Sequence, residues 1–510
     1  MEINIYLKNK EYYDDAQLLA RSFFVRANVN HFESSESGES KLYEDKVELF
    51  IENMTPSSEE EMSFSRGELH DIFKKRIYDH LRKLVGRDLP WGFLTGVRPS
   101  KRAMSMLENG HSDNEITKKF QNSYMVSNER AVLALEVAKN ERRIIKKLDA
   151  YNGYSLYLGI PFCPTTCLYC SFTSYPIMGA RKQGKVEKYL EALKKEIRET
   201  KSLLMEAGKR DKRFLKSPTS VYFGGGTPTS LNGEELDNLL GELTNTFDLE
   251  GTYEFTVEAG RPDSIDLEKL QVLKKYGVNR ISINPQTMND NTLKLIGRNH
   301  TSRDLLDAFV LAKNCGFKNI NMDIILGLPN EGKDEIIKTL EDVKSLNPDC
   351  LTVHSLAIKR AARLNTEKKK YESLSIDNDL DFMEMASEAA TSMAMNPYYM
   401  YRQQNMAGNL ENIGFSKWGK ESLYNILIME EIQPIIALGA GASSKFIYDN
   451  EDGRPGKRIE RAENVKDVDE YINRIDEMIL RKNDKLNGGN IIDNVNEGVY
   501  HEGVELAKAN

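Results

Sequence analysis

The sequence predicts an α/β protein built around a partial (β/α)6 barrel, and three observations lead to this fold class. From Tyr154 onward, six short apolar runs alternate with long amphipathic patterns of helical period. Such alternation is typical of parallel strands joined by crossover helices. Gly277 and Gly316 follow two of the helical patterns, where left-handed caps are expected. With 510 residues, of which 40% are hydrophobic, the chain is able to bury a large core and is not disordered overall.

Residues 1–150 are expected to form a separate α+β and helical module, whose role the sequence leaves open. Alternating and helical spacings of apolar residues define its elements. They predict strands at 1–7 and 46–54, helices at 13–25 and 67–84, and a mostly helical stretch over 91–150. The basic run Arg98–Arg102 is interpreted as a solvated helix start with Pro99 in its first turn.

Residues 151–372 are expected to form the barrel. The six strands are predicted at 155–160, 220–223, 253–258, 280–284, 319–326 and 350–354. The helices between them are predicted at 186–205, 234–247, 266–276, 303–314 and 333–346. Six units are fewer than the eight of a closed barrel, so we expect an open one, with its chemistry at the carboxyl ends of the strands.

Residues 373–481 are expected to form a mixed C-terminal region that covers the barrel. A charged linker over 363–380 leads into a helix at 380–395, and a last helix is predicted at 465–480. A tail over 482–510 is rich in Asn, Gly and Asp, and we expect it to be disordered.

Charge and cysteine content exclude several classes of protein. The chain has 70 Lys and Arg against 78 Asp and Glu, a net charge of −8, which argues against nucleic acid or a membrane surface as partner. No apolar run is long enough for a membrane span and the N-terminus lacks signal-peptide character, so we expect a soluble, cytoplasmic protein. Five cysteines are too few for a disulfide framework and indicate a reducing compartment.

Three of these cysteines form a C-x3-C-x2-C motif directly after the first barrel strand, at Cys163, Cys167 and Cys170. Clustered thiolates favour zinc or an iron–sulfur cluster. A closed zinc site needs a fourth ligand, and no histidine lies near in sequence. A cubane cluster held by three cysteines leaves one iron open to a small molecule. Zinc, and three merely buried thiols, are the weaker alternatives.

Other strand ends carry polar or flexible residues. Gly224, Gly225, Gly226 and Thr227 follow the second strand, and a glycine run lets backbone approach a ligand closely. Polar side chains end the next three strands or follow them, at Glu258, Asn284, Gln286 and Asp323. A carboxylate within an apolar strand is costly unless it is paired or functional, so an ion pair inside the barrel is the alternative for Glu258 and Asp323.

The cysteine loop, with Tyr169 before its last cysteine, resembles the radical S-adenosylmethionine (SAM) superfamily. The wider string Tyr157–Cys163 (YLGIPFC) is similar to the oxygen-independent coproporphyrinogen III oxidases, in the coproporphyrinogen dehydrogenase branch. The resemblance covers about Tyr154 to Ile472. It implies the radical SAM barrel, with a [4Fe-4S] cluster on the three cysteines. Its open iron would chelate SAM, which one electron then splits into methionine and a 5′-deoxyadenosyl radical.

The resemblance also implies roles for single residues. SAM would be held by the glycine run and by four polar residues that match the family's motifs; these positions are Gly224, Gly225, Gly226, Thr227, Glu258, Gln286, Arg298 and Asp323. Tyr157 and Arg298 would lie at the reacting centre, although a tyrosine in a barrel strand is often only core. His354 is interpreted as a core histidine.

The activity implied is the oxidative decarboxylation of coproporphyrinogen III to protoporphyrinogen IX, in porphyrin and haem biosynthesis. The partners implied are a tetrapyrrole and a low-potential electron donor such as a flavodoxin or ferredoxin; the oligomeric state is not indicated. Cations near the barrel mouth would suit the four propionates, and the candidates are Lys359, Arg360, Arg363 and Arg402. Tyr398, Tyr399 and Tyr401 would either stack on a tetrapyrrole or cover the barrel.

Three positions depart from the family's pattern. Phe172 stands where the oxidases have a further cysteine, Gly159 replaces a histidine, and the segment from Glu258 to Pro262 is one residue longer than the usual E-x-x-P. These departures keep two alternatives open. One is a haem-binding or haem-trafficking relative without oxidase activity, and the other is a radical SAM enzyme acting on another tetrapyrrole.

Overall fold

The computed structural model describes residues 1–24, 27–34, 38–96, 98–148, 150–357, 359, 361–371, 374–376, 379–403, 410–449 and 457–487.

The N-terminal residues form a four-stranded sheet in the order β2-β1-β4-β3, in which β1 runs parallel to both of its neighbours. The elements are β1 (Glu2–Tyr6), α1 (Tyr13–Phe23), β2 (Asn28–Phe32), β3 (Lys41–Leu42), β4 (Lys46–Phe50), α2 (Ser58–Ser63) and α3 (Arg66–Val85). Alternate residues such as Ile3, Ile5 and Leu49 are fully or almost fully buried in one core with residues of α1 and α3. Ser65 caps α3 in a reciprocal pair with Glu68, which is why the helix begins there.

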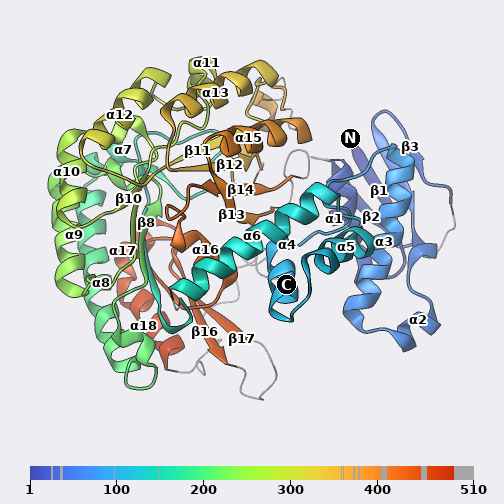
Figure 1. Cartoon of the computed structure of the whole chain (residues 1–510), viewed down its shortest axis with the longest axis horizontal. Coiled ribbons are helices and arrows are strands. Elements are labelled where there is room, and N and C mark those ends of the chain that lie inside the picture. Colours follow the sequence, from blue (N-terminus) through green and yellow to red (C-terminus); the bar gives the residue numbers. More distant parts are fainter. Residues whose placement is uncertain are drawn as a thin grey trace.

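Three helices connect this sheet to the rest of the molecule: α4 (Pro99–Glu108), α5 (Asp113–Tyr124) and α6 (Asn128–Lys147). In Figure 1, α6 extends from the N-terminal sheet across to the barrel. The helices share a hydrophobic core with the strand β13 (Asn396–Tyr401) and the helix α16 (Leu423–Glu430), which come much later in the chain. The N-terminal 150 residues are therefore joined to the C-terminal region by packing as well as by the chain.

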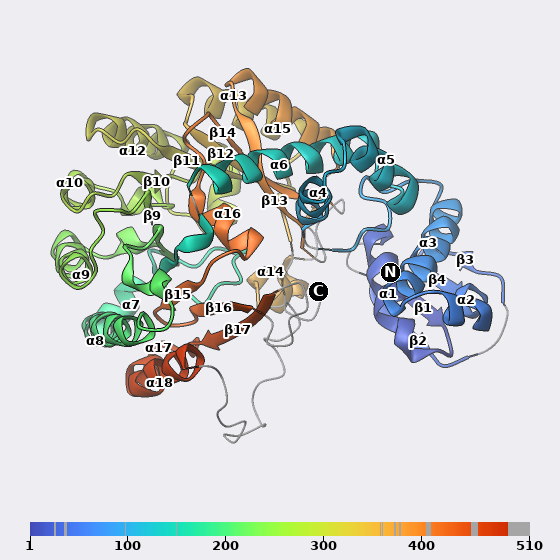
Figure 2. The ribbon, with the colours of Figure 1, turned by 60° about the horizontal axis from the view of Figure 1, so that its bottom comes forward.

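The barrel contains six parallel strands that pair in chain order. They are β5 (Ser155–Ile160), β8 (Ser220–Gly225), β9 (Glu254–Glu258), β10 (Arg280–Ser282), β11 (Ile320–Leu326) and β12 (Cys350–Ser355). The main helices between them are α8 (Lys185–Ala207), α9 (Gly233–Thr246), α10 (Leu267–Lys275), α12 (Ser302–Asn314) and α13 (Lys333–Leu346). These helices form an arc around the outside of the strands (Figure 2). The α/β fold and its six strand–helix units are as predicted.

The sheet extends beyond these six strands on both sides, which the sequence did not predict. β15 (Ile435–Leu438) pairs in parallel with β5, and it continues into the antiparallel strands β16 (Ser443–Asp449) and β17 (Lys457–Glu463). On the other side, β14 (Asn412–Ser416) pairs antiparallel with both β12 and β13. In the part of the chain that the structure describes, the sheet has eleven strands, and neither β5 nor β12 has an edge free to close the barrel.

The C-terminal region also contains α15 (Leu380–Ser392), α17 (Val468–Asn473) and α18 (Ile475–Leu486). The single helix expected over 465–480 is two helices, and the disorder expected from residue 482 is wrong for residues 482–486, which belong to α18. The reason is Lys482, which is fully buried and forms an ion pair of 2.6 Å with the equally buried Glu196 of α8. The tail beyond Asn487 lies outside the described residues.

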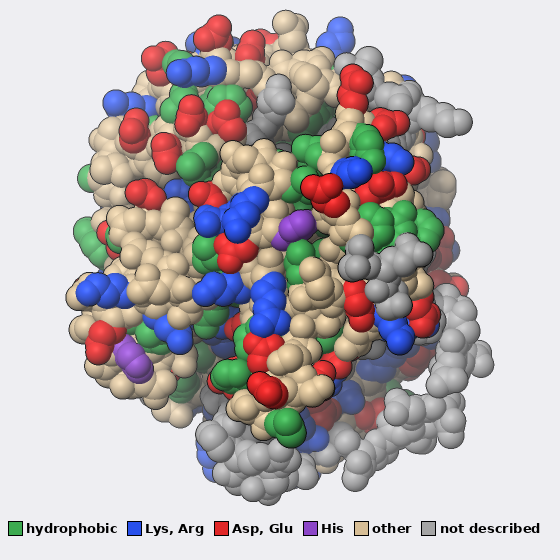
Figure 3. Space-filling view, turned by 90° about the vertical axis from the view of Figure 1, so that its right-hand side faces the viewer, with side chains coloured by type: hydrophobic (Ala, Val, Ile, Leu, Met, Phe, Trp, Pro, Cys, Tyr) green, Lys and Arg blue, Asp and Glu red, His purple; other side chains and the backbone are tan. Residues whose placement is uncertain are grey.

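The face of the molecule shown in Figure 3 carries acidic and basic side chains that are interspersed, and neither sign of charge dominates it. Within the described ranges, no helix combines the length and apolar character that crossing a membrane requires.

Candidate functional site

The three predicted cluster cysteines lie on the loop that follows β5. The loop is fastened at both ends and in its middle: β6 (Phe162–Cys163) pairs with β7 (Tyr175–Pro176), and the amide of Leu168 donates to the carbonyl of Ile296 over 2.9 Å. All three thiols are free, and each is partly exposed. The loop is therefore held in place by the barrel, at the carboxyl ends of its strands.

Two side chains from neighbouring strand ends donate to these sulfur atoms. The hydroxyl of Thr227 lies 3.5 Å from Cys163 Sγ, and Nη1 of Arg261 lies 3.8 Å from Cys167 Sγ. Burial raises the pKa of the Cys163 thiol, and it raises that of Cys170 to about 11. A bound metal centre would offset this cost, because it holds coordinating thiols in the deprotonated form.

The donor set fits an iron–sulfur cluster held on three cysteines, because it consists of soft thiolates with hydrogen-bond donors around them. This match concerns the chemistry of the ligands and a multi-iron cluster. A single metal ion is a different case: across the described ranges, no three His, Cys, Asp or Glu side chains lie close enough together to hold one.

The glycine run lies directly against the cysteine loop. The amide of Gly226 donates to the carbonyl of Ile160 over 2.8 Å, and that of Thr227 donates to the carbonyl of Phe162 over 2.7 Å. A Cβ added at Gly226 would lie 2.6 Å from the Phe162 oxygen and 3.0 Å from Cys163 Sγ. Gly225 has a φ of 102°, which side chains rarely tolerate. Glycine is therefore required here by close approach and by conformation.

Glu258, at the end of β9, points into the barrel beside a set of tyrosines. The hydroxyl of Tyr222 donates to Glu258 Oε1 over 2.6 Å. The Tyr222 ring stacks on Tyr424 of α16, with 4.4 Å between centroids, and Tyr157 lies parallel to both rings. Burial raises the pKa of Glu258 to about 7, against the hydrogen bond from Tyr222 and helped by the charge of Asp323. Burial also raises the pKa of Tyr157, which stays a neutral phenol.

Asp323, inside β11, is surrounded by hydrogen-bond donors. Its oxygens accept from Asn284 over 2.8 Å and from Asn321 over 2.7 Å, and the His354 ring lies 3.8 Å away. Burial opposes ionisation of Asp323, but these polar partners, His354 foremost, outweigh it and lower the pKa of the carboxyl. Asp323 is therefore the anion and Glu258 the readily protonated carboxyl of the pair. His354 is not simply a core residue, since it supports Asp323.

Arg298 connects these strand ends to the cysteine loop, whereas Gln286 follows β10 and lines a small cavity with residues of β11 and α13. Nη2 of Arg298 donates to the carbonyls of Gly260 and Asn284 over 2.6 and 2.8 Å, and Nη1 donates to the Tyr169 hydroxyl over 3.2 Å. Gln286 has a φ of 65°, a strained conformation for a residue with a side chain. Gln286 Oε1 and Arg298 Nε are buried and lack a hydrogen-bond partner among the described residues.

The structure brings the predicted site residues together at one end of the barrel, on β5, β8, β9, β11 and the segment after β10. Sequence reasoning missed Arg261, Tyr222 and Tyr424. Arg261 carried a signal, since it belongs to the segment that is one residue longer than the family's pattern. Tyr424 gave none, because α16 lies outside the barrel strands and reaches the barrel interior only through the tertiary fold.

The cations proposed for a tetrapyrrole are dispersed. Lys359 lies near the cysteine loop, with its amine 5.6 Å from the Phe172 ring. Arg363 pairs with Glu367 over 2.9 Å. Arg402 is buried, donates to the carbonyl of Leu94 and lies over the Trp91 ring. Its partners therefore belong to the segment between α3 and α4, and not to the barrel mouth. Arg360 lies outside the described residues. Tyr398 and Tyr399 are buried core residues, and Tyr401 packs at the edge of the same core.

Gly159 also has a structural reason. Its carbonyl accepts from the Tyr189 hydroxyl over 2.6 Å, and a Cβ added there would already touch the carbonyls of Leu438 and Ala440 at 3.5 and 3.6 Å. The segment after β15 therefore takes up the space that a larger side chain at position 159 would need.

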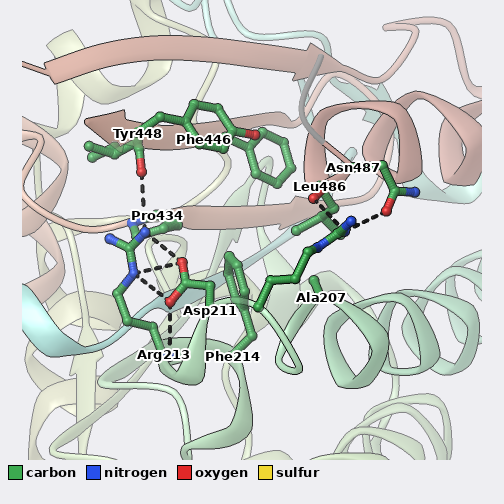
Figure 4. A pocket seen from close by; sticks show the side chains of 11 residues that line it. Ala207, Asp211, Arg213, Phe214, Pro434, Phe446, Tyr448, Leu486 and Asn487 are labelled. Carbon is green, nitrogen blue, oxygen red and sulfur yellow. Dashed lines mark hydrogen bonds and ion pairs between the residues drawn. The ribbon is translucent and has the colours of Figure 1, made fainter. Parts of the chain in front are cut away.

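A cavity of about 260 Å³ lies at the opposite end of the barrel, where β5 and β15 begin. Figure 4 shows it between the end of α8, β16 and the end of α18, with Arg213 held by Asp211 at its wall. It contains none of the predicted site residues.

Comparisons with known proteins agree with this site. The model of the radical SAM superfamily matches residues 157–343. The chain is 42% identical over 400 residues to "Oxygen-independent coproporphyrinogen-III oxidase-like protein HemZ" of Bacillus subtilis (strain 168), covering 78% of this chain and 77% of that one. It is 32% identical over 290 residues to "Heme chaperone HemW" of the same organism, covering 56% and 70%. The solved structure of the coproporphyrinogen III oxidase HemN of Escherichia coli, a radical SAM enzyme, has a TM-score of 0.49 and 22% identity, over 66% of this chain and 73% of that one.

Proposed function

This chain belongs to the radical SAM superfamily and, within it, to the proteins related to oxygen-independent coproporphyrinogen III oxidase. On that basis, we propose that it oxidatively decarboxylates coproporphyrinogen III to protoporphyrinogen IX without oxygen, in porphyrin biosynthesis. A low-potential one-electron carrier would supply the electron that starts each turnover.

Cys163, Cys167 and Cys170 would hold a [4Fe-4S] cluster, and the glycine run would bind SAM with Glu258, Gln286, Arg298 and Asp323. When bound, these two cofactors supply the capacity to remove a hydrogen atom from an unactivated carbon. The protein's own residues would bind and orient the cofactors and enclose the reacting groups. Gly226 lets the backbone of the glycine run lie against Cys163, Asp323 would supply a fixed negative charge, and the tyrosines around Glu258 would keep the interior dry.

The observation that carries this proposal is the extent of similarity to the oxidase-like relative. The match covers 400 residues at 42% identity, whereas the match to the haem chaperone covers 290 residues at 32%. The similarity therefore extends beyond what a shared barrel alone accounts for.

The test is an anaerobic assay of reconstituted protein with SAM, a low-potential reductant and coproporphyrinogen III. Mass spectrometry should detect products that have lost one and then two CO2, with 5′-deoxyadenosine formed alongside. The matched control is Cys167→Ala, which should lose the cluster and both products. If wild-type protein with a full cluster forms neither decarboxylated product, the proposal is wrong.

A second candidate is haem binding without decarboxylation. The observation in its favour is Phe172, which occupies the position of the oxidases' further cysteine and is 67% exposed beside the cluster loop. Stoichiometric binding of haem, seen as a new Soret band, without turnover of coproporphyrinogen III would favour it. A radical SAM reaction on another tetrapyrrole would appear when that compound replaces coproporphyrinogen III in the assay, as deoxyadenosine formed only in its presence.

A further inference from the structure

Arg261 lies directly behind the cysteine loop and contacts it at three atoms. Its side chain is almost fully buried, with a relative exposure of 3%. Nη1 lies 3.8 Å from Cys167 Sγ and 3.2 Å from the carbonyl of Thr165, and Nη2 lies 3.0 Å from the Thr165 hydroxyl. The guanidinium therefore places a positive charge against the second of the three sulfur ligands.

Asp263 orients this guanidinium from the other side. Its two oxygens accept from Nε and Nη2 of Arg261 over 2.9 and 2.7 Å. Of the three guanidinium nitrogens, Nη1 alone donates no hydrogen bond to Asp263 in the described contacts, and it is the one that faces the sulfur. The ring of His300 lies 4.0 Å behind Asp263, and burial together with Arg298 and Arg261 keeps it neutral. The pair thus presents a cation to the loop and turns its anion away.

We propose that Arg261, oriented by Asp263, sets the reduction potential of the cluster through its charge and its hydrogen bond to Cys167. The inference rests on the proposed function, because it requires the cluster. Reduction adds one electron from a one-electron carrier, and no bond or proton changes. The extra negative charge is stabilised by a nearby buried cation and by a hydrogen bond to a ligand sulfur, both of which raise the potential. The negative charge of Asp263 lowers the reduction potential.

The loop does not depend on Arg261 for its position. The Thr165 hydroxyl donates to the carbonyl of Gly297 over 2.7 Å, and the Leu168 amide donates to that of Ile296. Cβ contacts at Gly226 show that the other side of the loop is also closely packed. Variants at Arg261 should therefore keep a loop able to hold a cluster, and the potential remains measurable.

The experiment is a redox titration of the full-length, anaerobically reconstituted protein, followed by the electron paramagnetic resonance signal of the reduced cluster. Wild type is compared with Arg261→Gln, Arg261→Lys and Asp263→Asn at equal iron and sulfide content. At a fixed solution potential, Arg261→Gln should lower the ratio of reduced to oxidised cluster about tenfold, or ~59 mV for one electron. Asp263→Asn should raise that ratio, and Arg261→Lys should stay within about threefold of wild type, because it keeps the charge.

Opposite shifts in Arg261→Gln and Asp263→Asn are the signature that a purely structural role would not give. Unchanged potentials in intact clusters, or shifts of the same sign in both variants, overturn this inference and leave the proposed function standing. If wild-type protein takes up no iron and sulfide, the proposed function and this inference are both wrong. If Arg261→Gln fails to assemble a cluster, the other two variants decide: a wild-type potential in Asp263→Asn refutes the inference.

Discussion

Gly226→Ala is the substitution whose effect the structure defines most closely. The added Cβ would lie 2.6 Å from the Phe162 carbonyl oxygen and 2.8 Å from that of Ile160. Both oxygens are fixed, since they accept the amides of Thr227 and Gly226 over 2.7 and 2.8 Å. Neither atom is the end of a flexible side chain, so the backbone of the glycine run or of the cysteine loop has to move.

The size of this movement sets the expected effect. An ordinary contact begins at 3.4 Å, so the Phe162 oxygen and the new Cβ must separate by a further ~0.8 Å. Overpacking of this kind costs about 1–3 kcal/mol of stability. A shift of about 1 Å between reacting groups lowers a rate by roughly 100-fold. We therefore expect Gly226→Ala to fold, with a modestly lower melting temperature, and to cleave SAM about 100-fold more slowly.

The assay measures circular dichroism, iron and sulfide content, SAM binding by equilibrium dialysis, and the rate of 5′-deoxyadenosine formation. Gly179→Ala is the matched control, because a Cβ at Gly179, in α7 (Ile177–Lys182), would meet nothing within 4 Å. It should keep wild-type activity and gain up to about 1 kcal/mol of stability. Wild-type SAM affinity and cleavage in Gly226→Ala would refute the close approach of glycine run and cysteine loop.

Three further predictions concern buried charge. The pKa of Glu258 rises from 4.5 to about 7 on folding. The wild-type free energy of unfolding should therefore fall as pH rises from 4.5 to about 7, by at most roughly 3 kcal/mol, and stay low above that range. Glu258→Gln should remove this pH dependence. In denaturant titrations at about pH 5 and 8, the free energy of unfolding of the Gln variant, relative to wild type, should be higher at pH 8 than at pH 5. Lys482→Met should cost about 3–5 kcal/mol in the same titrations, because it leaves the fully buried Glu196 without its cation. Arg298→Lys should cost about 1–3 kcal/mol and weaken SAM binding, because one amine cannot replace the hydrogen bonds that Nη2 donates to both the Gly260 and the Asn284 carbonyls.

Each of these predictions has a control and a contradicting outcome. Glu250→Gln, at an exposed position, should leave the pH profile unchanged, and a Glu258→Gln profile parallel to wild type contradicts the shifted pKa. Lys195→Met breaks an exposed ion pair with Asp476 and should cost less than about 1 kcal/mol. Equal losses in the two lysine variants would show that burial of the Lys482 pair is not what matters. Wild-type SAM affinity in Arg298→Lys would show that Arg298 does not contribute to SAM binding in the way we expect.

The fold of the barrel could be predicted because it depends on local patterns. The helix predicted at 333–346 coincides with α13, and the strand at 155–160 coincides with β5. β15 was missed for the opposite reason: four apolar residues carry no clear period, and their partner β5 lies far back in the chain. Long-range pairing leaves no trace in local spacing.

The same limit applies to the site. Motifs located the cysteine loop, the glycine run and the polar strand ends, since these follow the strands at fixed places. The roles of long side chains depend on tertiary contacts, and Arg402 shows this: its place in a tyrosine-rich segment suggests the barrel mouth, but its guanidinium lies over the Trp91 ring. The polar residues that follow Lys482 predict a disordered tail, yet its partner Glu196 comes from a helix of the barrel.

In the function that we propose, this site removes hydrogen atoms from propionate side chains of a tetrapyrrole. It is tested most directly with coproporphyrinogen III deuterated at the β-carbons of its propionates, incubated anaerobically with reconstituted protein, SAM and reductant. We expect deuterium in the 5′-deoxyadenosine, in proportion to the CO2 lost. Deuterium-free deoxyadenosine, or decarboxylation without deoxyadenosine, would contradict it.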